Sequence, residues 1–298
     1  MMNGILVIDK QSTFTSFDVV AIVRGILREK KIGHSGTLDP MATGVLPILV
    51  GTAAKAQSLL PDTDKEYEAQ FRLGITTDTL DITGVVQSEK NCDHSEEDIQ
   101  NVLPRFRGDI MQVPPMYSAV QKNGVRLYDL ARQGIEVERE ARPVYVGKLE
   151  LIQFDRKTQS GRLAVSCSKG TYIRSICNDI GQALGCGCVL TALRRTRACG
   201  FTLDDAVTLE QLQQIKDNGR TAEYIRPTDS IFTCYPAVRV SEKQALRFSN
   251  GAALSLERLK GLGSFNDGDL FRVYGNDIFI GLGIIDLHQQ ELKVRKKF

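Results

Sequence analysis

The strict alternation of KEYEAQFRLG, residues 65 to 74, is the feature that most limits how this chain can fold. Apolar side chains fall on every second position, and charged or amide side chains fall between them. The apolar row is Tyr67, Ala69, Phe71 and Leu73. A period of two is typical of a strand that is buried on one face only. The sequence therefore predicts a sheet covered on one side, with Tyr67 at the start of the row that faces the core.

The other apolar segments mix strands with helices in no regular order. Strands are expected at residues 4–10, 144–154 and 162–168, and helices at residues 16–29 and about 171–184. Ser16 is the expected N-cap of the first helix. Because a regular βαβ rhythm is absent, the pattern favours an α+β fold with a mixed, largely antiparallel sheet and flanking helices.

A domain boundary is expected between Pro227 and Pro236, after a polar, helix-like segment. Residues 1–230 would form the larger domain, and residues 231–298 would form a small β-rich domain with glycine turns. From Tyr235 onward there are ten Lys or Arg residues against seven Asp or Glu residues, a net charge of +3, in a chain whose formal net charge is +2. The basic tail LKVRKKF is either an RNA phosphate contact or a solvated terminus.

Composition excludes several classes of protein. No run approaches the ~20 apolar residues that span a bilayer, and MMNGILVIDK lacks the layout of a signal peptide. The seven Cys residues are odd in number and scattered, which does not resemble a disulfide framework. The three His residues lie far apart in the sequence, and no Cys pairs have zinc spacing. The sequence predicts a cytoplasmic protein without a metal or a membrane segment.

One carboxylate stands in a segment made of loop residues, GHSGTLDPMATGVLP, at residues 33–47. Glycines permit backbone conformations closed to other residues, and Pro40 pushes Asp39 toward an extended conformation. Asp39 is either a simple turn cap or a carboxylate held in place for chemistry.

Arg174 falls in the first turn of the helix expected from about residue 171. A cation there faces the positive end of the helix dipole, which is unfavourable by roughly 0.3 to 1 kcal/mol. An anion is therefore expected beside it, and the planar guanidinium suits a carboxylate or a phosphate. A second basic stretch, LTALRRTRACGF at residues 190–201, either lines a phosphate groove or is a solvated face.

Five separated segments together resemble the TruB family of tRNA pseudouridine-55 synthases. They are GHSGTLDPMATGVLP, KEYEAQFRLGITTDTLDITG, PPMYSAVQKNGVRLYDLARQG, CSKGTYIRSICNDIGQALG and LTALRRTRACGF. The resemblance runs in order through about residues 4–230, and the C-terminal part resembles, more weakly, the small PUA-like RNA-binding domain of bacterial members. It implies the pseudouridine synthase fold and conversion of one uridine in the T loop of tRNA, with no cofactor and no metal.

The resemblance also implies residue roles. It assigns catalysis to Asp39, Tyr67 and Arg174. It assigns substrate binding to His34, Leu193, Lys10, Lys55 and Asp81, with His34 filling the space left by a flipped nucleotide and Leu193 packing in the base pocket. Two departures from the family pattern, Gln11 in place of Pro and Gln121 in place of Lys, bear on RNA contacts and not on the catalytic set.

Two other functions remain open at this stage. A protein that only binds and remodels tRNA would need no carboxylate facing a phosphate-rich ligand. A metal-free nucleoside or glycoside hydrolase would need a second carboxylate to activate water, and Asp81 is the nearest one in the motifs. No heptad run demands association, so a monomer is expected.

Overall fold

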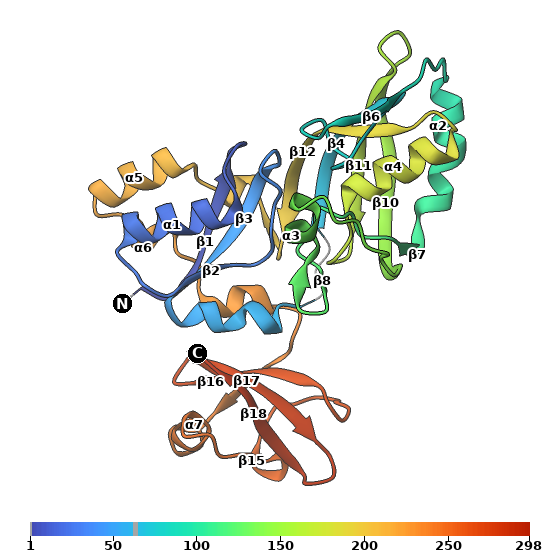
Figure 1. Ribbon diagram of the computed structural model, residues 1–298. Helices are drawn as coiled ribbons and strands as arrows, with labels where there is room; N and C mark the ends of the chain where they lie inside the picture. The colour runs from blue at the N-terminus through green and yellow to red at the C-terminus, as the bar shows by residue number, and fades with distance from the viewer. Residues whose placement is uncertain (1, 62–64) are drawn as a thin grey trace.

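Within residues 2–61 and 65–298, which are the residues that the computed structural model describes, nine strands form one sheet (Figure 1). The strands are β1 (Gly4–Lys10), β2 (Ile32–His34), β3 (Thr43–Val50), β4 (Lys65–Leu73), β7 (Gly108–Gln112), β10 (Arg142–Asp155), β11 (Ser160–Cys167), β12 (Cys188–Ala198) and β13 (Phe201–Thr202). Their order is β1-β3-β12-β4-β11-β10-β7, with β2 on β3 and β13 on β12. Only β3 and β12 pair in parallel in this sheet, so the expected α+β fold with a largely antiparallel sheet is confirmed.

Strand β4 has the burial that its alternation predicts. Tyr67, Ala69, Phe71 and Leu73 are buried, and the three residues between them are exposed. β4 pairs with β11 on one side and with β12 on the other, which puts it near the middle of the sheet. Tyr67 therefore lies on a central strand, on the covered face.

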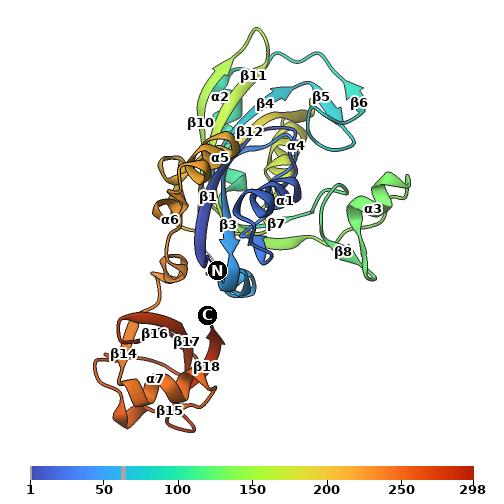
Figure 2. The ribbon, with the colours of Figure 1, turned by 90° about the vertical axis from the view of Figure 1, so that its left-hand side faces the viewer.

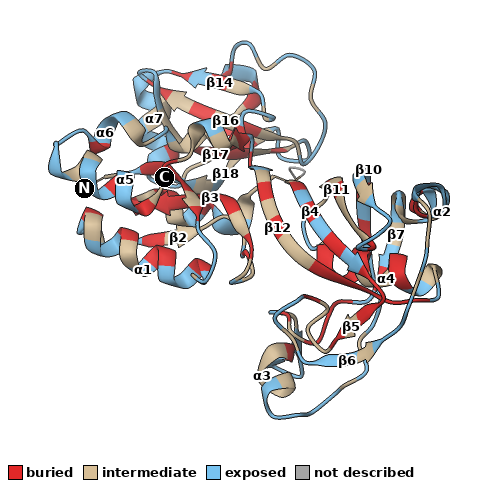
Figure 3. Ribbon diagram, turned by 90° about the horizontal axis from the view of Figure 1, so that it is seen from above, coloured by how far each residue is buried: buried red, intermediate tan, exposed pale blue. Residues whose placement is uncertain are grey.

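Two helices cover that face (Figure 1). They are α1 (Ser16–Leu27) and α4 (Ile173–Ala183), and a third helix, α5 (Leu209–Asp217), lies against α1. The apolar stripes of α1 and α4 join one core with alternate residues of β1, β3, β4 and β12. Seen from above, buried residues follow β3, β12 and α4 (Figure 3). Tyr67 and Leu193 belong to the core that these helices form with the sheet.

The expected N-cap of the first helix was wrong by one residue. Thr15 caps α1, because its Oγ1 accepts a hydrogen bond from Asp18 N at 3.0 Å and the Asp18 carboxylate accepts one from Thr15 N at 2.8 Å. This reciprocal pair is a capping box. Ser16 is buried instead, and its Oγ accepts from Leu38 N at 2.9 Å. Ser16 thus joins the start of α1 to the loop that carries Asp39.

Shorter elements connect the strands. They are the strands β5 (Ile75–Thr77) and β6 (Val86–Glu89), the helices α2 (Glu96–Val102) and α6 (Thr221–Tyr224), and the 3-10 turns η1 (Gly51–Leu59), η2 (Leu103–Phe106), η3 (Leu203–Asp205) and η4 (Thr228–Phe232). Between β7 and β10 the chain forms β8 (Gln121–Lys122), β9 (Val125–Arg126) and α3 (Leu127–Arg132), which protrude from the main body (Figure 2). None of the helices in the described part of the chain is long and apolar enough to cross a membrane.

The C-terminal part forms a second, five-stranded sheet, drawn in orange and red in Figure 1. Its elements are β14 (Ala237–Val240), α7 (Glu242–Ser249), β15 (Leu254–Ser255), η5 (Leu256–Arg258), β16 (Leu270–Gly275), β17 (Ile278–Asp286) and β18 (Glu291–Lys297). It has an apolar core of its own, around Phe248 and Phe271. A further apolar cluster joins Phe232 and Leu282 to Ile5 and Val7 of β1. The β-rich character expected here is confirmed, and the boundary at residue 230 stays a prediction.

Candidate active site

The loop between β2 and β3 holds Asp39 by contacts to three other segments. Lys10, at the end of β1, donates from Nζ to Pro40 O at 3.1 Å, and Thr13 N donates to the same oxygen at 2.9 Å. Ser16 of α1 binds the backbone of Leu38. Within the loop, Ala42 N donates to Asp39 O at 3.0 Å. The loop is therefore anchored on both sides of Asp39.

Glycine is required at one position of this loop. Gly44 has φ +103°, and a Cβ there would lie 2.1 Å from Arg195 O. This close approach is where β3 and β12 pair in parallel, through Arg194 with Thr43 and Arg195 with Gly44. The glycine thus allows the loop to end directly against the strand that carries Leu193.

Arg174 binds Asp39 with two parallel contacts, and this carboxylate is the anion that the sequence predicted beside Arg174. Arg174 Nε lies 2.9 Å from Asp39 Oδ2, and Nη2 donates to Asp39 Oδ1 at 3.1 Å. The same guanidinium donates to Thr79 O at 3.1 Å and to Tyr117 O at 2.9 Å. The Arg174 side chain is 5% exposed, whereas that of Asp39 is 33% exposed. A ligand can therefore reach the carboxylate, while its partner is enclosed.

Asp81 is a second carboxylate beside this pair. Its Oδ2 lies 3.8 Å from Arg174 Nη1, and its Oδ1 accepts from Thr79 Oγ1 at 2.9 Å and from Thr83 N at 3.0 Å. Burial raises the pKa of Asp39, the positive charge of Arg174 opposes this, and the negative charge of Asp81 raises that pKa further. Asp81 is buried, and its Oδ1 is bound by Thr79 and Thr83, so it does not offer an accessible carboxylate to activate water.

Tyr67 and Leu193 come from neighbouring strands and face the same side of the sheet. On β12, Leu193 lies opposite Ala69 and Arg195 lies opposite Tyr67. The Tyr67 and Leu193 side chains are 8% and 7% exposed and belong to the core that α1 and α4 cover. Burial raises the pKa of the Tyr67 phenol, and the charge of Arg195 opposes this rise.

His34 lies at the end of β2, next to the N-terminus of α1. Its ring meets that of Phe17 edge-on, with centroids 6.0 Å apart, and Phe17 is 72% exposed. Burial lowers the pKa of His34, which favours the neutral imidazole. His34 and Phe17 together form an aromatic corner beside the Asp39 loop.

The two lysines of the predicted set differ in position. Lys10 is fully buried, and its Nζ also donates to Gln11 O at 2.9 Å and Phe14 O at 2.6 Å. Burial lowers the pKa of Lys10 to about 8. Lys55 is exposed on η1. Lys10 therefore supports the Asp39 loop from inside, and Lys55 is free to meet a ligand from solvent.

The sequence interpretation missed Arg195. Three arginines of β12 were interpreted together as a phosphate groove or a solvated face. In the structure, Arg194 pairs with Asp9 at 2.8 Å and Arg197 pairs with Glu66 at 3.4 Å. Arg195, which lies between them, has no exposed surface. The phosphate-groove and solvated-face interpretations are wrong for Arg195. The alternation of the strand carried the missing signal, because Arg195 follows the buried Leu193 by two positions.

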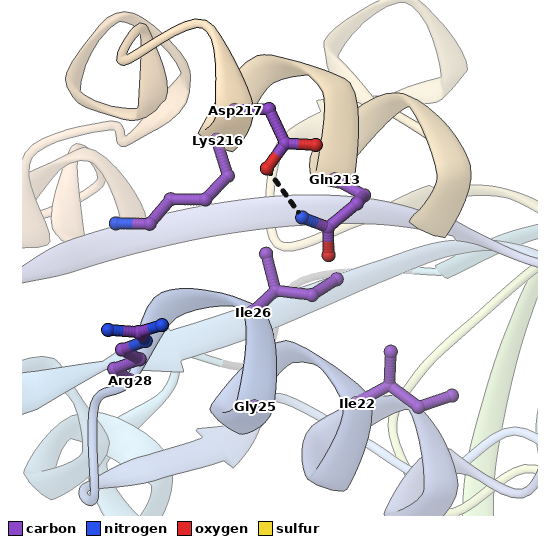
Figure 4. A pocket seen from close by; sticks show the side chains of 7 residues that line it. All are labelled: Ile22, Gly25, Ile26, Arg28, Gln213, Lys216 and Asp217. Atoms are coloured by element: carbon purple, nitrogen blue, oxygen red, sulfur yellow. Dashed lines mark hydrogen bonds between the residues drawn. The ribbon is translucent and has the colours of Figure 1, made fainter.

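One cavity of the protein lies outside the Asp39 site. This cavity, of about 510 Å³, lies between α1 and α5 and is lined by Ile22, Gly25, Ile26, Arg28, Gln213, Lys216 and Asp217 (Figure 4). None of these residues belongs to the predicted set. Among the residues that the structure describes, no cluster of His, Cys, Asp or Glu has the arrangement of a metal site.

Comparison with known proteins gives matches over most of the chain. The model of the TruB family pseudouridylate synthase (N terminal domain) matches residues 24–173, and that of the tRNA pseudouridylate synthase B C-terminal domain matches residues 174–233. A protein of Clostridium tetani (strain Massachusetts / E88) named tRNA pseudouridine synthase B is 41% identical over 283 residues, 95% of either chain. One of the same name from Pseudomonas aeruginosa (strain UCBPP-PA14) is 46% identical over 253 residues, 84% of this chain and 83% of the other.

Solved structures match the fold over nearly the whole chain. A chain from the crystal structure of a Cbf5-Nop10-Gar1 complex superposes with a TM-score of 0.78 at 28% identity, covering 99% of this chain and 84% of its own. A chain from an H/ACA RNP bound to a substrate RNA containing 2'-deoxyuridine superposes with a TM-score of 0.76 at 25% identity, covering 99% and 84%.

Proposed function

The chain belongs to the TruB family of pseudouridylate synthases, and from this premise we propose that it isomerises uridine 55 in the T loop of tRNA to pseudouridine. The curated relatives that match over most of their length carry the name tRNA pseudouridine synthase B. The observation that carries the proposal is the bidentate pair of Asp39 and Arg174, whose carboxylate stays 33% exposed.

The reaction sets three demands on a site. The bond from N1 to C1′ must break, the uracil must rotate while it is still held, and C5 must bond to C1′. Water must stay out throughout, because it would release the uracil. One accessible carboxylate is held by a buried guanidinium, and the buried Tyr67 and Leu193 lie on the covered face of the sheet. This arrangement meets the demands without a second carboxylate that would activate water.

In this proposal Asp39 is the catalytic group at C1′. The carboxylate can attack C1′, stabilise positive charge that develops there, or take a proton from the sugar, and the same geometry serves each route. Arg174 orients the carboxylate, and its charge counters the effect of burial on the pKa of Asp39. Asp81 holds the loop from Thr79 to Thr83 and the far side of Arg174, which is a supporting role in place of a direct substrate contact.

The target base must leave its stack to reach Asp39, at a cost of a few kcal/mol. In this proposal the Tyr67 ring offsets part of that cost by packing on the base, and Leu193 closes the pocket beside it. The Tyr67 hydroxyl relays the proton that leaves C5, and N1, which has lost its bond to C1′, takes up a proton, so that the net reaction is an isomerisation. His34 fills the space in the loop that the flipped nucleotide vacates, Lys10 positions the Asp39 loop, and Lys55 meets a phosphate from solvent.

The proposal extends to the surroundings of the reaction. Residues 1–230 form the catalytic domain, and residues 231–298 form a PUA-like domain that binds tRNA outside the T loop. The protein acts as a monomer in the cytoplasm on the T stem-loop. The basic tail from Lys293 to Lys297 supports a phosphate-binding role for the second domain.

The test is a product analysis with purified full-length protein and an unmodified tRNA transcript. The proposal expects one pseudouridine, in the T loop, and no free uracil. Release of uracil would identify a hydrolase instead, and tight tRNA binding without any product would identify a protein that only remodels tRNA. Mapping pseudouridine in tRNA from cells that lack this protein gives the same answer in the cell.

A further inference from the structure

Arg195 is a buried cation that the proposed reaction scheme does not use. It lies on β12 with 0% of its surface exposed, one strand away from Tyr67. Among the residues that the structure describes, no carboxylate lies within ion-pair distance of its guanidinium. Removing a charge from water without a counter-charge costs several kcal/mol, so such an arginine calls for an explanation.

The guanidinium binds both ends of the loop that carries Asp39. Nε donates to Val45 O at 2.7 Å, and Nη2 donates to Gly36 O at 3.2 Å. Gly36 precedes Asp39 by three residues, and Val45 follows it by six. One side chain therefore fixes the loop to the strand that carries Leu193, at the place where Gly44 already touches the backbone of Arg195.

The third nitrogen of the guanidinium, Nη1, is buried and has no hydrogen-bond acceptor among the described residues. The charge of Arg195 acts on the groups around it from three strands, which are Lys10 on β1, His34 on β2, and Lys65 and Tyr67 on β4. It lowers the pKa of each of them, and for Tyr67 it counters the rise that burial causes.

We propose that Arg195 is a positioning residue for this reaction: it clamps both ends of the Asp39 loop and holds a permanent positive charge beside the Tyr67 hydroxyl. The inference rests on the proposed function. A flipped base would meet Asp39 from the loop and Tyr67 from β4, and Arg195 binds the loop from the position on β12 opposite Tyr67. A displacement of about 1 Å between such groups can cost 10²-fold in rate.

The choice of arginine at this position follows from its chemistry. Arg195 reaches Val45 O and Gly36 O from two different nitrogens of one rigid plane, a geometry that the single nitrogen of a lysine does not reproduce. A lysine at the same place would be buried like Lys10, whose pKa burial lowers to about 8, and it would lie near the positive charges of Lys10 and Lys65. It would therefore lose its charge within the working range of pH, whereas a guanidinium keeps it.

The test compares Arg195→Lys and Arg195→Gln with Arg197→Lys, an exposed arginine two residues further on the same strand. For Arg195→Lys we expect kcat for pseudouridine formation to fall about 10-fold at pH 7 and about 100-fold at pH 9, with KM for tRNA changed by less than about threefold. For Arg195→Gln the loss should be about 100-fold at both pH values. Arg197→Lys should follow the wild type at every pH.

A purely structural role gives a different result. It would lower the melting temperature of both Arg195 variants while their pH profiles stayed parallel to that of the wild type, and this outcome would overturn the proposal. If Arg195→Gln fails to fold, the pH profile of Arg195→Lys still distinguishes the positioning role from a purely structural one.

A double-mutant cycle with Tyr67→Phe adds a second readout. If Arg195 acts through Tyr67, the two substitutions combined should cost clearly less than the product of the single effects. Fully multiplicative effects would contradict the link to Tyr67. Failure of the wild type to form pseudouridine would refute the proposed function itself, and this outcome is distinct from any result on Arg195.

Discussion

Charge is arranged in opposite ways in the Asp39 site and in the C-terminal sheet. At the site, Arg174 is 5% exposed and Arg195 and Lys10 are 0% exposed, and most of their donors bind backbone carbonyls or carboxylates. In the C-terminal sheet, the pair of Arg239 and Asp277 is 74% and 83% exposed. Buried charges are costly and hold one geometry, whereas exposed charges contribute little to stability and act on a ligand at a distance.

This difference suits the Asp39 site to the chemical step and the C-terminal sheet to RNA binding. Side chains whose positions are fixed by burial suit a chemical step, which depends on geometry. Exposed cations suit binding to phosphates, which depends on charge and weakens as salt is added. Substitutions at the site should therefore change the rate, and substitutions in the C-terminal sheet should change affinity and its salt dependence.

The largest expected effect is that of Asp39→Asn. The substitution preserves the shape of the side chain and one acceptor for Arg174, but it removes the anion that acts at C1′. Pseudouridine formation should fall by at least about 10³-fold, and the Kd for tRNA should stay within a few fold of the wild type. Both are measured on one preparation of each protein. Turnover near that of the wild type would show that Asp39 is not the catalytic group, and that the chemical step does not depend on the buried charges of this site.

Arg174→Lys should have the next largest effect. A point charge cannot reproduce the two parallel contacts to Asp39 while also binding the carbonyls of Thr79 and Tyr117. We expect about a 10²-fold loss in single-turnover rate with little change in tRNA affinity. If the variant keeps more than about half of the activity, orientation by the guanidinium is not what the site needs.

Asp81→Asn should move the pH profile in a defined direction. Activity requires the Asp39 carboxylate, so the rate falls as pH drops through the pKa of Asp39. The negative charge of Asp81 raises that pKa, so its removal should lower it and shift the acid limb to lower pH. Asparagine keeps an oxygen for Thr79 and Thr83. An acid limb that stays in place or moves to higher pH would show that Asp81 does not act on Asp39 through charge.

The smallest expected effect is that of Arg295→Gln combined with Lys296→Gln on β18. The single-turnover rate at saturating tRNA should not change, and the slope of log affinity against log salt should become shallower by roughly 0.7 to 0.9 for each phosphate that the variant no longer binds. Lys157→Gln, in the turn between β10 and β11 at the other end of the molecule, is a control that removes one exposed charge (Figure 1). An unchanged salt slope would show that Arg295 and Lys296 of the C-terminal tail do not bind tRNA phosphates.

Substitution tests this part better than removal of the C-terminal sheet. Phe232 and Leu282 share an apolar cluster with Ile5 and Val7 of the main sheet. A chain cut near residue 233 would expose that cluster to water, and the loss of buried apolar area would destabilise the remainder. A drop in tRNA affinity after such a cut could then come from lost RNA contacts or from the destabilised main domain.

Local patterns in the sequence predicted the parts of the structure that local physics determines. The alternation from Tyr67 to Leu73 indicated the buried face of β4, and the cation in the first turn of α4 indicated a nearby anion, which is Asp39. The segments at residues 144–154 and 162–168 became β10 and β11 with ends shifted by one or two residues.

Contacts between distant segments were harder to foresee. Thr15 and Ser16 are both good caps, and the choice between them depends on Leu38, which binds Ser16 from another segment. Lys10 is buried because three carbonyls converge on its ammonium, and two of them belong to Gln11 and Phe14 in the turn that follows β1. Arg195 is buried because the Asp39 loop closes over it. Residue type alone places lysine and arginine on the surface, so the burial of Lys10 and Arg195 could be seen only in the fold.

The most direct test of the division between site and C-terminal sheet is the salt dependence of two quantities in the wild-type protein. Single-turnover pseudouridine formation is measured at saturating tRNA, and the Kd for the same tRNA is measured in parallel, from about 50 to 200 mM salt. We predict that the Kd rises steeply with salt while the saturated rate constant stays constant within about twofold. A saturated rate constant that falls with salt as steeply as the affinity would contradict this division, because the chemical step would then depend on exposed charge.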